Sequence, residues 1–173
     1  MMEYQSCFDI IGPIMVGPSS SHTAGVVSIG KFIYELLQGR PEKAEIIFYD
    51  SFSETFQGHG TDKALLGGLL GMETDDSRIK HAIELTRENG LYYELDLKDR
   101  CPYFDHPNTT IITAKRGESV VKVGGASLGG GLSKIFMIDD KTFDIRLSTS
   151  DDFSTLAAHY RPNTLKEVVL EGV

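Results

Sequence analysis

The sequence has few cysteines, only Cys7 and Cys101 in 173 residues. Two thiolates cannot supply the four ligands that an iron–sulfur cluster normally takes, so any cluster would have to be anchored mainly on another chain. The two thiols could form one disulfide, but a cytosolic chain of this size does not need one. We therefore expect two ordinary cysteines that are buried or partly buried.

Positive charge is also scarce. The chain has 17 Lys and Arg against 25 Asp and Glu, which gives a formal net charge of −8. This balance gives little electrostatic support to nucleic-acid binding. It does not exclude a small anionic ligand, because a local cradle of N–H groups and hydroxyls can outweigh the field of the whole molecule.

Long hydrophobic runs are absent. The longest, in residues 26–37 and 64–70, are interrupted by Gly, Ser, Lys or Glu and fall short of a membrane span. The N-terminus shows no basic region followed by an apolar stretch, so we expect no secretory signal and a cytoplasmic location. A composition of 40% hydrophobic and 24% charged residues suits one domain with a core of its own.

The order of the expected elements indicates the α+β class. Apolar residues at helical spacing predict helices over residues 22–38 and 62–70, and a third from a cap at Asp75 or Asp76 through Thr86. Apolar runs and alternation predict strands over 44–49, 91–97, 109–114, 119–123, 133–138 and 142–147. The last four strands form two hairpins, with turns at 116–117 and 139–141. This order predicts one mixed, mainly antiparallel sheet with helices packed on one face.

Residues 17–25, GPSSSHTAG, place three serines, a histidine and a threonine directly ahead of a helix. One serine would be enough to cap that helix. The free N–H groups and the dipole of the first helical turn favour an anion such as a carboxylate. The residues alone leave two interpretations open, an anion cradle or an over-supplied helix cap.

His59 lies between two glycines in QGHGTDK, residues 57–63. The glycines allow tight backbone approach and leave the imidazole little steric cover. An imidazole beside an acidic carboxylate suits general base work near neutral pH, and Thr61 or Asp62 starts the next helix. The alternative is a turn histidine on the surface, which is the commoner fate of a lone histidine.

Two further stretches are richer in polar groups or glycine than packing requires. In DHPNTT, residues 105–110, Asn108 and Thr109 offer hydrogen bonds at a strand start, and an ordinary Pro-Asn turn is the alternative. In VGGASLGGG, residues 123–131, Ser127 lies among glycines, which marks a strand end where a ligand, metal or partner chain approaches the backbone. A bulged or flexible loop is the alternative there.

Taken together, GPSSSHTAG, GHGTDKALLGGLLG, HPNTT and SLGGG, in that order and at about these spacings, resemble the beta subunit of the bacterial iron–sulfur L-serine dehydratases, also called L-serine deaminases. The resemblance covers about residues 5–150, and the run SCFDIIGPIMVGPSSSHTAG is its most specific part. It implies an α+β fold similar to the substrate-binding domain of some phosphoglycerate dehydrogenases.

The resemblance implies elimination of water from L-serine, which gives aminoacrylate, then an imine, then pyruvate and ammonia. In two-chain members the alpha subunit carries the cysteines of a 4Fe–4S cluster, one iron of which acts as a Lewis acid on the substrate, and the beta subunit completes the site. The expected partners are thus that alpha subunit and L-serine, in a homodimer or an alpha–beta hetero-oligomer, without nucleic acid or membrane. Whether a monovalent cation is also needed stays open.

The resemblance also implies roles for particular residues. His59, in the family's GHGTD motif, is the leading candidate for the catalytic base. The other candidates are expected to bind substrate, shape its pocket or lie near the alpha-subunit interface; they are Ser19, Ser20, Ser21, His22, Thr23, Thr61, Asn108, Thr109 and Ser127. No metal ligand is expected in this chain.

Many beta subunits of this family continue into an ACT-type regulatory domain. We expect residues 1–150 to form the beta domain, and residues 151–173 to be a tail that matches the start of such a module, with a strand and then a helix after Arg161-Pro162. A second interpretation of the chain is a non-catalytic module that binds serine or another small anion. A purely structural role ranks last, because it explains the glycines but not the concentrated Ser, His and Asn groups.

Overall fold

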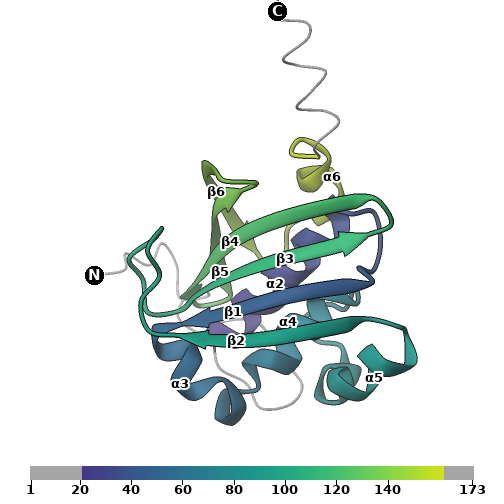
Figure 1. The fold of residues 1–173 in the computed structure, drawn as a ribbon, viewed down its shortest axis with the longest axis horizontal. Coiled ribbons are helices and arrows are strands. Elements are labelled where there is room, and N and C mark those ends of the chain that lie inside the picture. The colour runs from purple at the N-terminus through teal and green to yellow at the C-terminus, as the bar shows by residue number, and fades with distance from the viewer. Residues whose placement is uncertain (1–20, 162–173) are drawn as a thin grey trace, which may run out of the picture.

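The computed structural model describes residues 21–161, which form a six-stranded sheet with helices behind it in the view of Figure 1. The elements, in chain order, are α2 (Ser21–Leu36), β1 (Lys43–Tyr49), α3 (Asp50–His59), α4 (Thr61–Leu69), η1 (Ser77–His81), α5 (Ala82–Glu88), β2 (Tyr92–Lys98), β3 (Thr109–Arg116), β4 (Ser119–Gly129), β5 (Leu132–Ile138), β6 (Lys141–Ser148) and α6 (Phe153–Ala158). None of these helices is both long enough and apolar enough to cross a bilayer.

The strand order is β2-β1-β3-β4-β5-β6. Strands β1 and β2 are parallel, because the chain passes through α3, α4, η1 and α5 between them. Every other neighbouring pair is antiparallel. The expected α+β class with a mixed, mainly antiparallel sheet is therefore confirmed.

The main core lies between helix α2 and the sheet. One face of α2 buries Val26, Ile29 and Ile33 completely or almost so, and α2 packs on α4 as well as on β4 and β5. Burial of each such side chain contributes about 1.5–3 kcal/mol. Helix α2 is thus packed between α4 and the sheet, and this packing fixes the position of its first turn.

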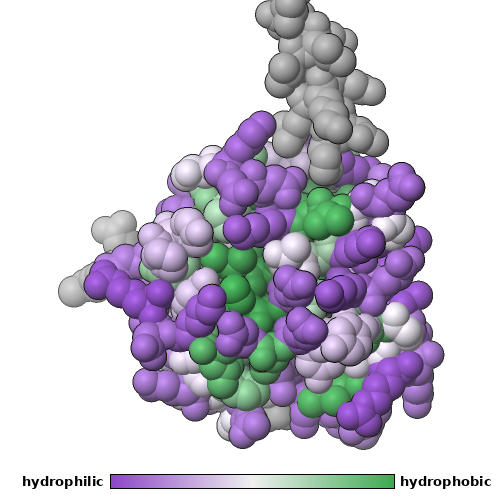
Figure 2. Space-filling model, in the orientation of Figure 1, coloured by the Kyte–Doolittle hydropathy of each residue, from purple (hydrophilic) through white to green (hydrophobic). Residues whose placement is uncertain are grey.

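The opposite face of the sheet carries a smaller hydrophobic cluster, defined by Tyr49, Cys101, Ile111, Phe136 and Met137. The segment between β2 and β3 contributes Cys101, whose free thiol is buried there. Figure 2, drawn in the orientation of Figure 1, shows hydrophobic surface in the middle of this side of the molecule, surrounded by polar residues. The segment that precedes β3 is therefore packed on the sheet through Cys101.

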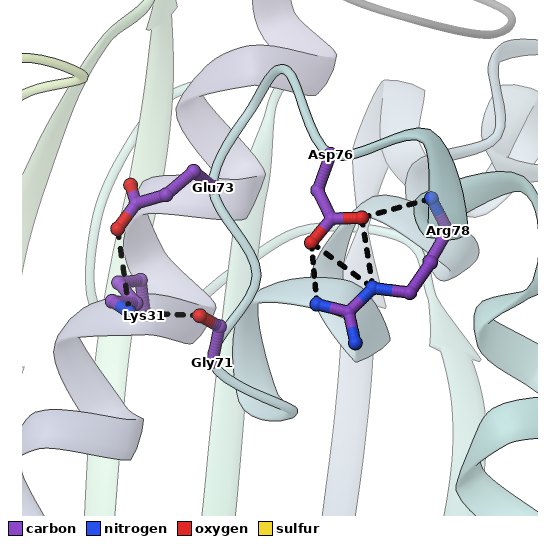
Figure 3. A network of polar contacts seen from close by, with 5 residues as sticks. All are labelled: Lys31, Gly71, Glu73, Asp76 and Arg78. Carbon is purple, nitrogen blue, oxygen red and sulfur yellow. Dashed lines mark hydrogen bonds and ion pairs between the residues drawn. The ribbon is translucent and has the colours of Figure 1, made fainter.

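A polar network ties α2 to the segment after α4, as Figure 3 shows. Lys31 Nζ donates to the carbonyl of Gly71 at 2.8 Å and lies 3.3 Å from a carboxylate oxygen of Glu73. The Lys31 side chain is only 14% exposed, and these two partners offset the free energy that it costs to bury its charge.

Nearby, Asp76 accepts from the Arg78 main-chain N–H at 2.9 Å and caps η1. Hydrogen bonds from the Arg78 side chain hold the pKa of Asp76 below its usual value.

Two helical segments differ from expectation. Residues 50–59, for which the sequence analysis names no element, form α3; Phe52 and Phe56 pack their rings on Phe48, and this tertiary contact supports a segment of weak helix propensity. The single helix expected from Asp76 to Thr86 is divided into η1 and α5. The predicted cap at Asp76 is nonetheless confirmed.

Of two other segments, one agrees with expectation and one is corrected. Residues 123–129 form the last part of β4, which ends at Gly129. They pair with β5, and as far as Ala126 also with β3, and the register with β5 shifts between Gly124 and Gly125 and between Ser127 and Gly129, as at β-bulges. Glycine is needed there because Phe136 and Ile29 fill the space that a Cβ would take at Gly124 and Gly125. After residue 150 the chain forms α6, capped by Asp152, where a strand was expected. Residues 162–173, including the helix expected after Pro162, lie outside the described part, and the boundary at residue 150 stays a prediction.

Candidate functional site

At one edge of the sheet, hydrogen bonds link three histidines from distant parts of the chain, His22 and His106 through their rings and His59 through its main-chain carbonyl. His22 lies in the first turn of α2, His59 is the last residue of α3, and His106 lies three residues before β3. Asn108 contacts the rings of both His22 and His106, while Thr23 bonds the backbone of His59. The site is thus built from the start of α2, the end of α3, the start of β3 and the end of β4.

The imidazole of His22 is fixed by two neighbours. Its Nδ1 lies 3.2 Å from the carbonyl oxygen of Ser127 and 3.1 Å from the side-chain amide of Asn108. A carbonyl oxygen can only accept, so the first contact is a hydrogen bond when Nδ1 carries the proton. In the structure Nδ2 of Asn108 faces Nδ1, so this tautomer requires the Asn108 amide to present its oxygen to the ring instead. In this tautomer Nε2 of His22 keeps its lone pair and can accept a proton.

The imidazole of His106 is held in the opposite tautomer. The main-chain N–H of Asn108 donates to His106 Nδ1 at 3.1 Å, so that nitrogen carries the lone pair and the proton is on Nε2. The ring stacks on Phe104, with centroids 6.4 Å apart. Burial, followed by the nearby His22, lowers the pKa of His106, and Asp105 opposes this shift. His106 therefore favours its neutral form.

His59 combines a fixed backbone with an exposed side chain. Gly60, in the left-handed conformation at φ 67°, ends α3 directly after it. The carbonyl of His59 accepts a hydrogen bond from Thr23 Oγ1 at 3.2 Å. The imidazole is exposed, so it is available to a ligand or partner at this edge. His59 is the last residue of α3 and so lies at a helix end, rather than in a turn outside any helix.

The remaining candidates divide into three groups. Asn108, Thr109 and Ser127 join the histidine cluster, and the Ser127 main-chain N–H donates to the Asn108 carbonyl at 2.9 Å. Thr61 is buried at the start of α4, one residue after Gly60. Ser19 and Ser20 lie outside the described residues, and of Ser21 only the backbone is described, at the start of α2.

His106 is the site residue that the sequence interpretation missed. The stretch DHPNTT indicates Asn108 and Thr109 as candidates and gives His106 no role, whereas the ring of His106 accepts from Asn108 and lies near His22. The sequence does carry one signal for His106, since this histidine lies directly before Pro-Asn at the start of a strand. A turn of this kind projects neighbouring side chains beyond the sheet edge, where loop residues gather into sites.

We expect the free energy of unfolding to fall as the pH drops below about 6.5, and His106 to account for part of this fall. Since its pKa is lowered in the folded chain, the unfolded chain takes up the proton first, and acid favours unfolding until the folded-state pKa is reached. Urea unfolding between about pH 5 and pH 8 tests this. His106→Gln should flatten the dependence, with the same change at exposed His81 as the control. An undiminished slope in His106→Gln would contradict the prediction.

An α+β domain that gathers imidazole, amide and hydroxyl groups at one sheet edge has the groups required of a proton-transfer site. Residues 6–120 match the family model described as "Serine dehydratase beta chain". The chain belongs to this family.

Named relatives agree with this assignment. The chain is 44% identical over 165 residues to the probable L-serine dehydratase beta chain of Bacillus subtilis, covering 90% of this chain and 73% of that one. It is 39% identical over 162 residues to the L-serine dehydratase beta chain of Peptoniphilus asaccharolyticus, with coverage of 92% and 70%. It is also 29% identical to L-serine dehydratase 1 of Escherichia coli, where it covers only 34% of a longer chain.

Proposed function

We propose that this chain is the beta subunit of an L-serine dehydratase, a lyase that acts with an alpha subunit to convert L-serine to pyruvate and ammonia. Family membership supports the reaction class. The observation that carries the proposal is the meeting of His22 and His106, which stand far apart in the sequence, on Asn108, with the backbone of His59 bonded to Thr23 beside His22. A module that only bound an anion would not need this concentration of proton acceptors.

The first turn of α2 is assigned to the substrate carboxylate. Helix N-termini favour anions through their free N–H groups and dipole. His22 keeps its Nδ1 bond to Ser127 whether or not Nε2 is protonated. It can therefore take up a proton at Nε2 and donate a hydrogen bond from that N–H to a carboxylate without moving. The side chain of Asn108 contacts the same nitrogen, Nδ1, and helps to orient the ring.

His59 is assigned to proton removal. Loss of water from serine requires removal of the α-hydrogen, a weak acid, and departure of the hydroxyl group. The exposed imidazole on an anchored backbone is free to meet a bound substrate next to α2. Removal of the proton and loss of hydroxide leave aminoacrylate, which tautomerises to an imine and is hydrolysed to pyruvate and ammonia.

The described residues do not fit an iron–sulfur cluster. Among residues 21–161 no group of three or more His, Cys, Asp or Glu is arranged to hold a metal ion, and the cysteine there, Cys101, is free and buried. We therefore assign the proposed 4Fe–4S cluster to the alpha subunit, which would meet this chain at the histidine edge. The alpha–beta association and the cytoplasmic location remain predictions.

Anaerobic assay of pyruvate formation from L-serine tests the proposed function. We expect no turnover from this chain alone and turnover after mixing with a cluster-loaded alpha subunit, because each chain holds part of the site. The alpha subunit alone is the control. No pyruvate from a mixture in which the cluster and the complex are both verified would contradict the proposal and favour a serine-binding or small-anion-binding module.

A further inference from the structure

The main-chain carbonyl of each site histidine accepts a hydrogen bond from a buried hydroxyl. Ser127 Oγ donates to the His22 carbonyl at 2.7 Å, and Thr109 Oγ1 donates to the His106 carbonyl at 2.6 Å. Thr23 Oγ1 donates to the His59 carbonyl at 3.2 Å. The same contact thus recurs at all three histidines, in three different local structures.

The donors have almost no access to solvent. Ser127 and Thr109 are 0% exposed, and Thr23 is 2% exposed. A hydroxyl has one proton to donate. Once the protons of Ser127 and Thr109 are given to main-chain carbonyls, these groups can only accept, and a substrate carboxylate accepts as well. Direct recognition of a carboxylate by these two hydroxyls would require their present hydrogen bonds to break.

Ser127 holds His22 at two points, because its hydroxyl bonds the His22 carbonyl and its own carbonyl bonds the His22 ring. Helix α2 lies directly on β4 at this place. A Cβ at Gly25 would clash with Ser127 Oγ and would lie 2.9 Å from the carbonyl oxygen of Leu132. The small residue at position 25 therefore lets the helix approach closely enough for both bonds to form.

We propose that Ser127, Thr109 and Thr23 are positioning residues, whose buried hydroxyls each fix the backbone of one site histidine, and that Ser127 and Thr109 do not bind substrate. This replaces the substrate-binding role expected for them from the sequence. Among the described candidates in contact with the two hydroxyls or their histidines, His22, His59 and Asn108 are then left to meet substrate beside the first turn of α2. The effect on kcat and KM rests on the proposed function, whereas the effect of these hydroxyls on the positions of the histidines does not.

The first test uses the chain alone and needs no activity. Thr109→Val removes the hydroxyl with little change of shape, and Thr109→Ser keeps it. Long-range ¹H–¹⁵N spectra of the imidazoles should show the His106 resonances and their titration shifted in Thr109→Val and restored in Thr109→Ser. Thr113→Val, on the same strand, is the matched control. Likewise, Ser127→Ala should move the His22 resonances. Unchanged His106 resonances in Thr109→Val would overturn the proposal.

The second test uses the alpha–beta complex. Thr109→Val should lower kcat about tenfold, as expected when a reacting group is slightly misplaced, with KM changed less than about twofold, and Thr109→Ser should restore kcat. A raised KM with unchanged kcat would instead identify Thr109 as a substrate-binding residue and overturn the proposal. If the unmodified complex makes no pyruvate, the proposed function fails, and the spectra of the chain alone still decide the positioning role.

Discussion

His59→Ala is expected to lower the rate of pyruvate formation by about 10²-fold or more, the usual scale for a removed acid–base group. The imidazole stands exposed at the end of α3 while its carbonyl is anchored by Thr23, so it can reach a substrate without reorganisation of the backbone. Substrate affinity should largely survive, because the carboxylate is assigned to the first turn of α2. The loss should therefore fall on kcat rather than on KM.

The measurement is steady-state kinetics of the alpha–beta complex over a range of pH. His81→Ala is the matched control, since His81 is an exposed histidine on η1, outside the cluster, and should leave the rate near normal. A near-normal rate in His59→Ala would remove His59 from the role of base and direct attention to Nε2 of His22. Circular dichroism of each variant would confirm that the fold is intact.

Gly68→Ala should destabilise the chain by about 3 kcal/mol or more, at the upper end of what overpacking costs. Helices α2 and α4 cross with their backbones in contact at this glycine. A Cβ on Gly68 would clash with the carbonyl oxygen of Val27 and would lie 2.9 Å from Cα of Gly30. Backbone atoms cannot move aside as a flexible side chain can, so the helices would have to separate.

Urea unfolding measures this effect, and Gly58→Ala supplies the control. Gly58 lies in α3 with no atom within 4 Å of a Cβ placed there, so alanine should be neutral or stabilising by roughly 0.5 kcal/mol. Equal stabilities of the two variants would show that the crossing can widen without cost. Because α2 carries His22 and α4 follows directly on His59 and Gly60, a folded Gly68→Ala chain should also lose activity.

Much of the fold was predictable because its determinants are local. Alternating apolar residues located the strands of the two hairpins, and the turn at Asp139 and Asp140 takes the positive φ values that short hairpin turns prefer. The apolar face at helical spacing located α2 and α4 to within one or two residues. Helix α3 was not predictable, since its stability comes from packing of Phe52 and Phe56 on Phe48.

The candidate site was predictable as a set of residue types, not as an arrangement. The sequence by itself determined the family and the class of chemistry, and it singled out His22, His59 and Asn108 as candidates, because these lie in short motifs whose composition exceeds packing needs. Only the tertiary structure decided that His106 belongs to the cluster and that the hydroxyls of Ser127, Thr109 and Thr23 face backbone carbonyls. The physical reason is that two of these three hydrogen bonds join segments 36 and 105 residues apart, and their partners are set by how α2 packs on the end of α3 and on β4 rather than by any local pattern.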